Sequence, residues 1–500
     1  MFDHVIVGAG SAGATLAARL SEDAGTSVLL LEAGPDHTSA DTPAGIAAIN
    51  HIAALGDQGR YWPNLLAVRV AGQQPSLYLR GRGAGGSSAI NGMLTIRGIP
   101  EDYDRWAQAL GCPDWGWSEM LPAFLAVEDD VDYGGDGYHG RGGTIPLRRN
   151  DLSASPPIDT ALRQALGDLG HSFCDDYHAP GATGLSRGAF ANRGGRRVST
   201  NDAYLEGARG RENLSVRGDV LVDRVLLDGR RATGVITATG EEIEAGEVIV
   251  SAGAIHSPAL LLRSGVGPAA GLAVGENLME HPMARFVFHV ADRARATSAE
   301  CSPAHTLLRY SSQLADAGPN DMQMAWFSHL GARTEDLGVG LLFVAAMRVF
   351  SRGQVRLRST DPYVDPVVDM DLLSDERDLV RMRDGVRRAV RVLRHSTIEA
   401  ATTRVTAGTE PMDCLSGDDE IDAWLRRNAT DYVHAAGTCR MGSPGDPAAV
   451  VDTRCRVIGF ERLRVCDASV IPDLPRANTH LTTVAIAERI AAAVREEHAL

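Results

Sequence analysis

The stretch FDHVIVGAGSAGATLAARL, residues 2–20, places a short apolar strand, a Gly8-x-Gly10-x-x-Gly13 turn and a helix in direct succession. A second apolar strand at 27–31 follows and ends at Glu32. This βαβ order is typical of dinucleotide binding: Gly8 makes the tight turn, Gly10 lets backbone approach a pyrophosphate, and Gly13 lets helix and strand pack closely. An acidic residue about 20 positions on suits the ribose hydroxyls. The pattern alone does not distinguish NAD from FAD.

A second glycine-rich stretch, GRGAGGSSAING at residues 81–92, has several small residues in succession. Successive exposed backbone N–H groups suit an anion or the edge of a flavin. A flexible linker has the same composition. Apolar residues follow at once at 93–96, which favours a structured loop over a linker.

The remaining hydrophobic patterns predict the rest of the fold. Residues 213–250 alternate as strands with tight turns, and 247–254 form a buried strand that ends in a glycine turn. Runs of period two between 283 and 358 predict a mostly antiparallel sheet, a wall for a substrate pocket. Helical spacing marks 157–170, 375–397, 419–427 and 482–495. We therefore expect an α/β protein with a discontinuous Rossmann-like domain and a second α+β domain built on an antiparallel sheet.

Composition excludes several classes of function. The 500 residues carry a formal net charge of −15, which disfavours nucleic acid and anionic membrane surfaces as partners. No apolar run approaches the roughly 20 residues of a membrane span, and a strand at residue 2 leaves no room for a signal peptide. The seven cysteines include no CxxC pair, so we expect a reducing, cytoplasmic setting with no metal site and no disulfides. The oligomeric state stays open.

Two histidines near the C-terminal end stand in distinctive surroundings. His434 opens HAAGTCRMG, and His480 lies in RANTHLTT just before the last predicted helix. A histidine suits proton transfer because its pKa lies near the operating pH. With fifteen histidines in the chain, most are structural or exposed, so the case for these two rests on their motifs.

With these motifs in view, the chain resembles the glucose–methanol–choline (GMC) family of FAD-dependent oxidoreductases over nearly its whole length. The resemblance rests on six ordered motifs: VIVGAGSAGATLAARL with LLLEAGP, GRGAGGSSAINGM, SAGAIHSPALLLRSGVGP, VGENLMEHP, HAAGTCRMG, and LRVCDASVIPDLPRANTHLTT. Within the family, YWPNL and LLSDERDL are most similar to the bacterial hydroxymethylfurfural and aryl-alcohol oxidase branch. The implied domains are residues 1–100, 195–282 and 430–500 for FAD binding, and 101–194 and 283–429 for substrate binding.

The resemblance implies FAD rather than NAD, bound by a defined set of residues. Glu32 and Ala33 would hold the adenosine ribose, and Val222 would meet the adenine through its backbone. The pyrophosphate would be contacted by Gly8, Gly10, Ser11, Ala12 and Gly13. The flavin side would be contacted by Gly85, Gly86, Asn91 and Met93, and the ribityl chain and ring by Asp467, Ala468 and Asn478. Because Ile90 stands where some members carry a histidine bonded to the flavin, we expect non-covalent FAD.

The resemblance also implies the chemistry. His434 matches the family's general base, and His480 is assigned to the second catalytic position, where it would hydrogen-bond the substrate oxygen. The expected reaction oxidises a primary alcohol, aryl or polyol-like, to an aldehyde with hydride transfer to flavin N5. The N-terminus of the following helix would favour negative charge on the reduced flavin.

Three alternatives remain open from the sequence. A dehydrogenase would pass electrons to a quinone or another carrier instead of oxygen, with an amino-sugar or other metabolite alcohol as substrate. A hydroxynitrile lyase would use FAD only as a structural part. A non-catalytic flavin-binding protein is disfavoured because both histidine positions are filled.

Overall fold

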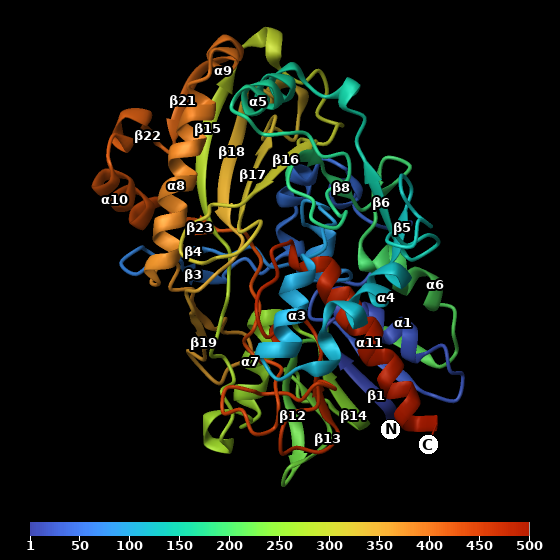
Figure 1. Ribbon diagram of the computed structural model, residues 1–500. Helices are drawn as coiled ribbons and strands as arrows, with labels where there is room; N and C mark the ends of the chain where they lie inside the picture. Colours follow the sequence, from blue (N-terminus) through green and yellow to red (C-terminus); the bar gives the residue numbers. More distant parts are fainter. Residues whose placement is uncertain (500) are drawn as a thin grey trace.

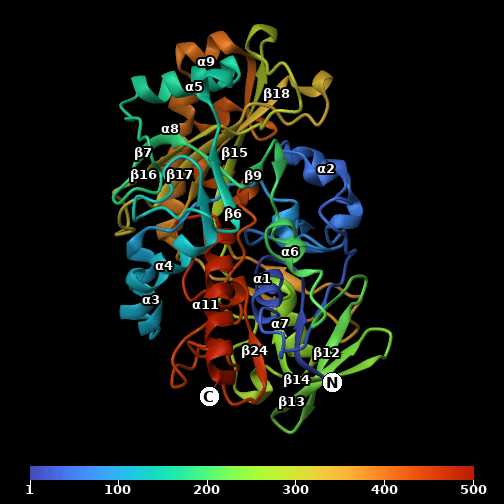
Figure 2. The ribbon, with the colours of Figure 1, turned by 90° about the vertical axis from the view of Figure 1, so that its right-hand side faces the viewer.

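The computed structural model describes residues 1–499, and two large sheets dominate it. The sheet that contains β1 lies at the lower end of the molecule in Figure 1, and the sheet that contains β15 to β18 lies at the upper end. Both chain termini lie at the lower end, in both ribbon views (Figures 1 and 2). Among residues 1–499, no helix combines the length and apolar composition that crossing a bilayer requires.

The first sheet is the dinucleotide fold that the N-terminal pattern predicts. Its parallel part has the order β11-β2-β1-β14-β24. The bounds are β1 Phe2–Val7, β2 Val28–Leu31, β11 Leu214–Arg217, β14 Glu242–Val250 and β24 Leu463–Val465. These strands are apolar because helices cover both faces. One is α1 (Ser11–Leu20), which lies beside the long C-terminal helix α11 (Thr479–Ala499) in Figure 2.

Two further strands extend this sheet with antiparallel pairing. β12 (Val222–Asp228) pairs with β13 (Arg231–Thr237), which pairs with the first part of β14. The predicted alternation of residues 213–250 is thus confirmed. Helix α7 (Gly253–Arg263) begins directly after β14 and returns along the sheet.

The second sheet is antiparallel, as the period-two runs predict. Its order is β22-β21-β15-β18-β17-β16-β7, with β23 beside β15. The bounds are β7 Gly184–Arg187, β15 Pro282–Val290, β16 Thr306–Tyr310, β17 Met322–Phe327, β18 Val339–Ala346, β21 Thr402–Ala407, β22 Glu410–Pro411 and β23 Thr430–Asp431. The helices on it are α5 Pro157–Asp168, α8 Glu376–Leu393, α9 Ser396–Ala401 and α10 Asp418–Asn428.

Alternation along these strands places their aromatic side chains on two different faces of the sheet. Phe286, Phe288 and Trp326 are fully buried in the core cluster that includes helix α8. Phe327 and Phe343 instead line the large cavity on the other face of the sheet. Only the second pair can therefore shape a ligand site.

Smaller elements complete the fold. Helices α3 (Pro100–Ala109) and α4 (Trp117–Val127) pack with their tryptophans into the core that also holds α11. A four-stranded sheet joins two distant parts of the chain through β3 Leu66–Val68, β4 Ser76–Leu77, β19 Gln354–Arg356 and β20 Val367–Asp369. A three-stranded sheet contains β5 Glu128–Asp130, β6 Ile145–Arg149 and β8 Ala189–Phe190. The short hairpin β9 (Asn192–Arg193) and β10 (Arg196–Arg197) and the helices α2 Ala44–Ala47 and α6 Glu206–Ala208 lie nearby.

Candidate functional site

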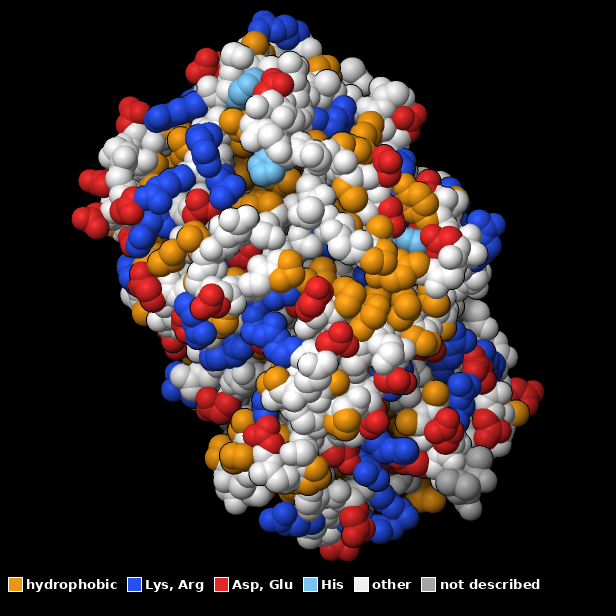
Figure 3. All heavy atoms as spheres, in the orientation of Figure 1, with side chains coloured by type: hydrophobic (Ala, Val, Ile, Leu, Met, Phe, Trp, Pro, Cys, Tyr) orange, Lys and Arg blue, Asp and Glu red, His pale blue; other side chains and the backbone are white. Residues whose placement is uncertain are grey.

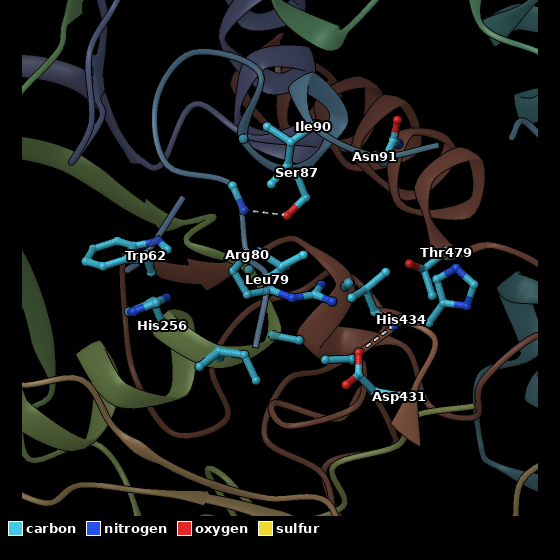
Figure 4. A pocket seen from close by; sticks show the side chains of 18 of the residues that line it. Trp62, Leu79, Arg80, Ser87, Ile90, Asn91, His256, Asp431, His434 and Thr479 are labelled. Atoms are coloured by element: carbon cyan, nitrogen blue, oxygen red, sulfur yellow. Dashed lines mark hydrogen bonds between the residues drawn. The ribbon is translucent and has the colours of Figure 1, made fainter. Parts of the chain in front are cut away.

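One cavity of about 1170 Å³ runs from the carboxyl ends of β1, β2 and β14 to the exposed face of the antiparallel sheet. It exceeds the roughly 300–1,000 Å³ of most small-ligand sites, so it has room for a dinucleotide together with a substrate. The predicted site residues that line it are Gly8, Gly10, Ser11, Ala12, Glu32, Ala33, Gly86, Asn91, Val222, Asp467, Ala468, Asn478, His434 and His480. Ser87, Ile90 and Asn91 stand along one side of the close view in Figure 4, opposite Arg80 and Asp431.

The first glycine turn has the geometry of a phosphate cradle. Gly8 has a φ of +104° and donates its N–H to the carbonyl of Leu31 at 2.7 Å. A Cβ on Gly13 would lie 1.8 Å from the Gly8 oxygen, so Gly13 serves close packing. A Cβ on Gly10 would meet only the Cα of Gly86, at 3.9 Å, so Gly10 borders open space. Helix α1 begins at Ser11 and directs its free N–H groups to that space, which fits a pyrophosphate.

Glu32 ties three loops together at the adenosine end. Its carboxylate accepts the backbone N–H groups of Ala9, Gly34 and Gly83, each at 2.8 Å. A carboxylate has about four acceptor sites, so one remains for a ribose hydroxyl. The expected ribose role therefore fits this position.

Three of the expected cofactor residues do not line the cavity. Gly13 packs beneath the turn, as described above. Gly85 has a φ of +86° and donates its N–H to Ala9, which fixes the second glycine loop against the first. Met93 is buried against Phe190 and Ala304. These residues can support the cavity wall, and only their neighbours Gly86 and Asn91 face the cavity.

Asp467 anchors the ribityl end of the site. Its carboxylate accepts the N–H of Gly253 at 2.8 Å and the hydroxyl of Ser257 at 2.5 Å. Burial raises the pKa of Asp467, and these donors oppose that shift. The residue holds the start of α7 against the strand β24, so Ala468 is presented to the cavity.

A chain of hydrogen bonds fixes the tautomer of His434. The carbonyl of Met347 lies 3.0 Å from Nε2 of His281, and a carbonyl only accepts, so this nitrogen carries a proton. Burial lowers the pKa of His281 to about 3, so the ring is neutral and its Nδ1 is a bare acceptor. The Nδ1 of His434, 2.9 Å away, must therefore donate to it. Since burial, His281 and Arg80 hold the pKa of His434 well below its usual range, its Nε2 stays unprotonated and can accept a hydrogen bond.

The Glu280 carboxylate holds the backbone of His434 in place through a hydrogen bond. The N–H of His434 points between the two carboxylate oxygens of Glu280, at 2.8 and 2.7 Å. The hydroxyl of Tyr78 donates to the same carboxylate at 2.7 Å. Burial and the charge of Asp431 raise the pKa of Glu280 to about 7. The guanidinium of Arg80 stacks on the Tyr78 ring at 4.4 Å, and its Nε and Nη2 have no hydrogen-bond partner among the described residues 1–499.

The residue before the base has a strained backbone. Val433 has a φ of +59°, which is rare for a β-branched side chain. Its N–H donates to Asp431 at 3.1 Å, and the Asp431 carboxylate is held by Nε of Arg69 at 2.5 Å. Such strain persists only where the surroundings enforce it, and here it directs His434 into the cavity.

The structure brings Asn478, and not His480, to the free nitrogen of the base. The amide Nδ2 of Asn478 lies 3.0 Å from His434 Nε2 and donates to it. The Nδ1 of His480 instead lies 2.9 Å from the hydroxyl of Ser11, in the phosphate turn. Burial, followed by the charge of Arg197, lowers the pKa of His480 to about 4. The hydrogen bonds thus favour Asn478 over His480 as partner of His434, which departs from the expectation from the sequence.

Sequence reasoning missed most of this support. It did not select Glu280, His281, Tyr78 or Arg80. The signal was the Glu-His pair of the VGENLMEHP motif, which lies at the start of β15, directly opposite the loop that carries His434.

Two clusters of His and acidic side chains have the spacing of metal ligands. In Glu280, His281 and His434, the nitrogens are engaged in the hydrogen-bond chain above. In Asp130, His139 and His178, the Asp130 carboxylate already pairs with both terminal nitrogens of Arg149, at 2.8 and 3.0 Å. Neither arrangement leaves a free set of ligands.

Comparison with known proteins identifies the family to which the chain belongs. Two family profiles described as GMC oxidoreductase match residues 2–283 and 349–487. The chain belongs to the GMC oxidoreductase family. It is therefore a FAD-dependent enzyme that oxidises alcohols as an oxidase or dehydrogenase, and the family resemblance of its motifs is confirmed.

Several relatives match this GMC enzyme over nearly its full length. The 5-(hydroxymethyl)furfural oxidase of Methylovorus sp. is 37% identical and covers 99% of this chain and 98% of its own. The oxygen-dependent choline dehydrogenase of Pseudomonas putida is 34% identical, covering 99% and 94%. The crystal structure of pyridoxine 4-oxidase from Mesorbium loti is similar with a TM-score of 0.87 and 29% identity, covering 99% of both chains. The predicted fold class is thus confirmed.

Proposed function

We propose that this GMC enzyme oxidises a primary alcohol to an aldehyde with His434 as general base. The observation that carries the proposal is the unprotonated Nε2 of His434, set by the hydrogen-bond chain from Met347 through His281, which accepts from Asn478 where an alcohol hydroxyl would donate. When bound, FAD would supply the acceptor for the hydride that leaves the alcohol carbon. The residues of this chain then have to bind the alcohol, orient it and take its hydroxyl proton.

His434 can take that proton without a prior change of charge. Its ring stays neutral at pH 7 because its pKa is lowered, and its Nδ1 proton is already committed to His281. An alcohol hydroxyl would donate to Nε2, and proton transfer there makes hydride loss feasible. A Glu280 carboxylate oxygen lies within 4.8 Å of a His434 ring nitrogen and would offset the charge of the resulting imidazolium.

Asn478 is the second group that we assign to the alcohol oxygen. Its Nδ2 donates towards His434 Nε2, and the same amide can donate to a hydroxyl oxygen placed between them. His480 was our choice from the sequence for this role. Its bond to Ser11 supports a role beside the phosphate turn, so we assign it to the cofactor side.

The cofactor contacts follow from the cavity lining. Glu32 and Ala33 would hold the ribose, the turn from Gly8 to Ala12 the pyrophosphate, and Asn91 with Gly86 the flavin side. We propose that FAD is held without a covalent bond, because the cavity-lining side chain at position 90 is isoleucine, which has no nucleophile. Release of free FAD on denaturation in acid would test this.

The substrate end of the cavity favours an alcohol with an apolar body. Met283, Phe327, Leu341 and Phe343 form one side of it. The relatives named for hydroxymethylfurfural and pyridoxine oxidation act on a hydroxymethyl group on a ring, and we extend that class, a ring-borne primary alcohol, to this chain. Oxygen as acceptor is extended from the same relatives. A dehydrogenase that passes electrons to a carrier other than oxygen is the alternative that the test below distinguishes from an oxidase.

The test is anaerobic mixing of the purified yellow protein with a panel of alcohols, followed by oxygen. Bleaching of the flavin by a ring-borne primary alcohol supports the proposal, and fast recolouring by oxygen identifies an oxidase. Slow recolouring with fast transfer to a quinone identifies a dehydrogenase. Turnover of a cyanohydrin with no bleaching by any alcohol would instead identify a lyase and overturn the proposal.

A further inference from the structure

Arg285 is a charged group in an otherwise apolar wall. It lies on β15 two residues after Met283, so both side chains share one face of the sheet, and its cross-strand neighbour is Phe343. All three residues line the cavity. The Arg285 side chain is exposed where it borders the cavity, and among residues 1–499 no hydrogen bond or ion pair engages its guanidinium.

The nearest carboxylate is already in use. Asp431 accepts from Nε of Arg69 at 2.5 Å and from the N–H of Val433. Asp431 raises the pKa of Arg285 and Arg69 lowers it, so one carboxylate stands beside two guanidinium groups. The local charge is therefore positive, and among residues 1–499 no carboxylate pairs with the guanidinium of Arg285.

The surrounding lining has the same sign. Arg80, Arg426 and Arg427 also line this end of the cavity. Of the described lining residues from 69–80, 283–285, 327–343 and 426–435, Asp431 is the one carboxylate. On the outer face in Figure 3, acidic and basic side chains are interspersed, and the chain as a whole carries a net charge of −15. A concentration of arginines inside a cavity of an acidic protein focuses positive potential there.

We propose that the alcohol oxidised by this enzyme carries a carboxylate, which Arg285 binds while the hydroxymethyl group reaches His434. This inference rests on the proposed function and names its substrate class. The planar guanidinium can hold a carboxylate with two parallel hydrogen bonds. Phe343 and Met283, on either side of Arg285, would cover the apolar body that joins the two ends of the substrate. The same arginines repel a cationic alcohol.

The first test compares three alcohols in anaerobic flavin reduction by the holoenzyme. 4-(Hydroxymethyl)benzoate should reduce the flavin with an apparent Kd at least ~10-fold lower than that of 4-methylbenzyl alcohol, which has a similar shape and no charge. Choline should reduce it least. Equal or tighter binding of the neutral alcohol would overturn the inference. A ~10-fold preference for 4-(hydroxymethyl)phenyl phosphate over the carboxylate would overturn the choice of carboxylate.

The second test measures binding without turnover. 4-Methylbenzoate, which cannot be oxidised at a hydroxyl, should perturb the flavin absorbance of the holoenzyme. Arg285→Met should weaken this binding by at least ~10-fold, and Arg285→Lys should weaken it less. Arg404→Met is the matched control, because Arg404 is an exposed arginine on β21 of the same sheet that lies outside the cavity lining, and it should bind as the parent does. Equal binding by Arg285→Met and the parent would overturn the inference.

The outcomes separate the two proposals. Flavin bleaching by 4-methylbenzyl alcohol with no preference for the carboxylate leaves the proposed function standing and removes this inference. Arg285-dependent binding of 4-methylbenzoate with no bleaching by any alcohol removes the proposed function, and with it the substrate class, and leaves only carboxylate binding by Arg285. If Arg285→Met does not load FAD, the same question is tested on the unmodified enzyme. Raising the ionic strength should weaken its binding of 4-methylbenzoate and leave its binding of the neutral alcohol unaffected.

Discussion

The Nδ1 atoms of His281 and His434 lie 2.9 Å apart, so one ring has to donate and the other accept. The carbonyl of Met347 decides which, because it engages the other nitrogen of His281. The orientation of the proposed base is thus set by a neighbouring ring that does not touch the Nε2 side where the substrate would bind.

Removing the base should abolish most of the chemistry. His434→Ala is expected to slow flavin reduction at saturating alcohol by at least ~10²-fold, the usual range for a general base, with FAD content unchanged. Stopped-flow absorbance of the anaerobic enzyme measures this. Near-normal reduction would remove His434 from the role.

His281→Ala should act through His434. Without the acceptor on Nδ1, the His434 ring can adopt the other tautomer, so we expect flavin reduction to fall ~10-fold and its pH profile to shift. His281→Gln offers a carbonyl acceptor and should restore part of the rate. An unchanged pH profile in His281→Ala would mean that the bond is structural only.

Asn478 and His480 should differ in effect. Asn478→Ala should slow flavin reduction by ~10-fold or more, because its amide faces Nε2 of His434. His480→Ala, which loses the bond to Ser11, should mainly weaken FAD retention. Titration of apoprotein with FAD and reduction kinetics separate the two effects, and the opposite pattern would return the second catalytic role to His480.

Gly10 and Gly13 give a matched test of the cofactor cradle. Gly13→Ala should fail to fold, since its Cβ would lie 1.8 Å from the Gly8 oxygen. Gly10→Ala should fold, because its Cβ meets only an ordinary contact at 3.9 Å, and yet lose FAD affinity by crowding the pyrophosphate. Far-UV circular dichroism and FAD content measure both. Full FAD loading in a folded Gly10→Ala would contradict the cradle.

Buried neutral histidines should make the fold acid-sensitive. The pKa of His281 is about 3 in the folded protein, below the unfolded value near 6.5, so below pH 6.5 the unfolded chain binds the extra proton. Stability is therefore lost as the pH falls from 6.5 towards 3, by about 2 kcal/mol at pH 5 for this one ring. Melting temperatures of the parent and His281→Gln between pH 5 and 8 test this, and the variant should depend less steeply on pH. Equal slopes would contradict it.

Local patterns were enough to predict the frame of this fold. The apolar run at 4–7, the glycine turn and Glu32 specify a βαβ unit within about 30 residues, and strict alternation after residue 283 specifies an antiparallel sheet. The roles of Asn478 and His480 could not be assigned in this way. They lie two residues apart at the start of α11, so their side chains point about 200° apart, and only tertiary structure decides which one meets His434.

Long-range contacts account for the rest. His281 and His434 are separated by 153 positions, and the strand that carries one is placed against the loop that carries the other by the pairing of β15 with β23. The periodicity of hydrophobic residues along the sequence does not predict which distant strands pair. The same holds for Arg285, whose significance depends on Asp431 being already occupied by Arg69.

Because the control over the base comes from the main-chain oxygen of residue 347, the identity of that side chain is not fixed by the chemistry. Met347 packs in an apolar cluster with Phe343, Ala345 and Tyr432, beside the substrate wall. A protein engineer could therefore vary residue 347 among apolar side chains of similar volume to reshape the pocket, and the proton relay would be retained.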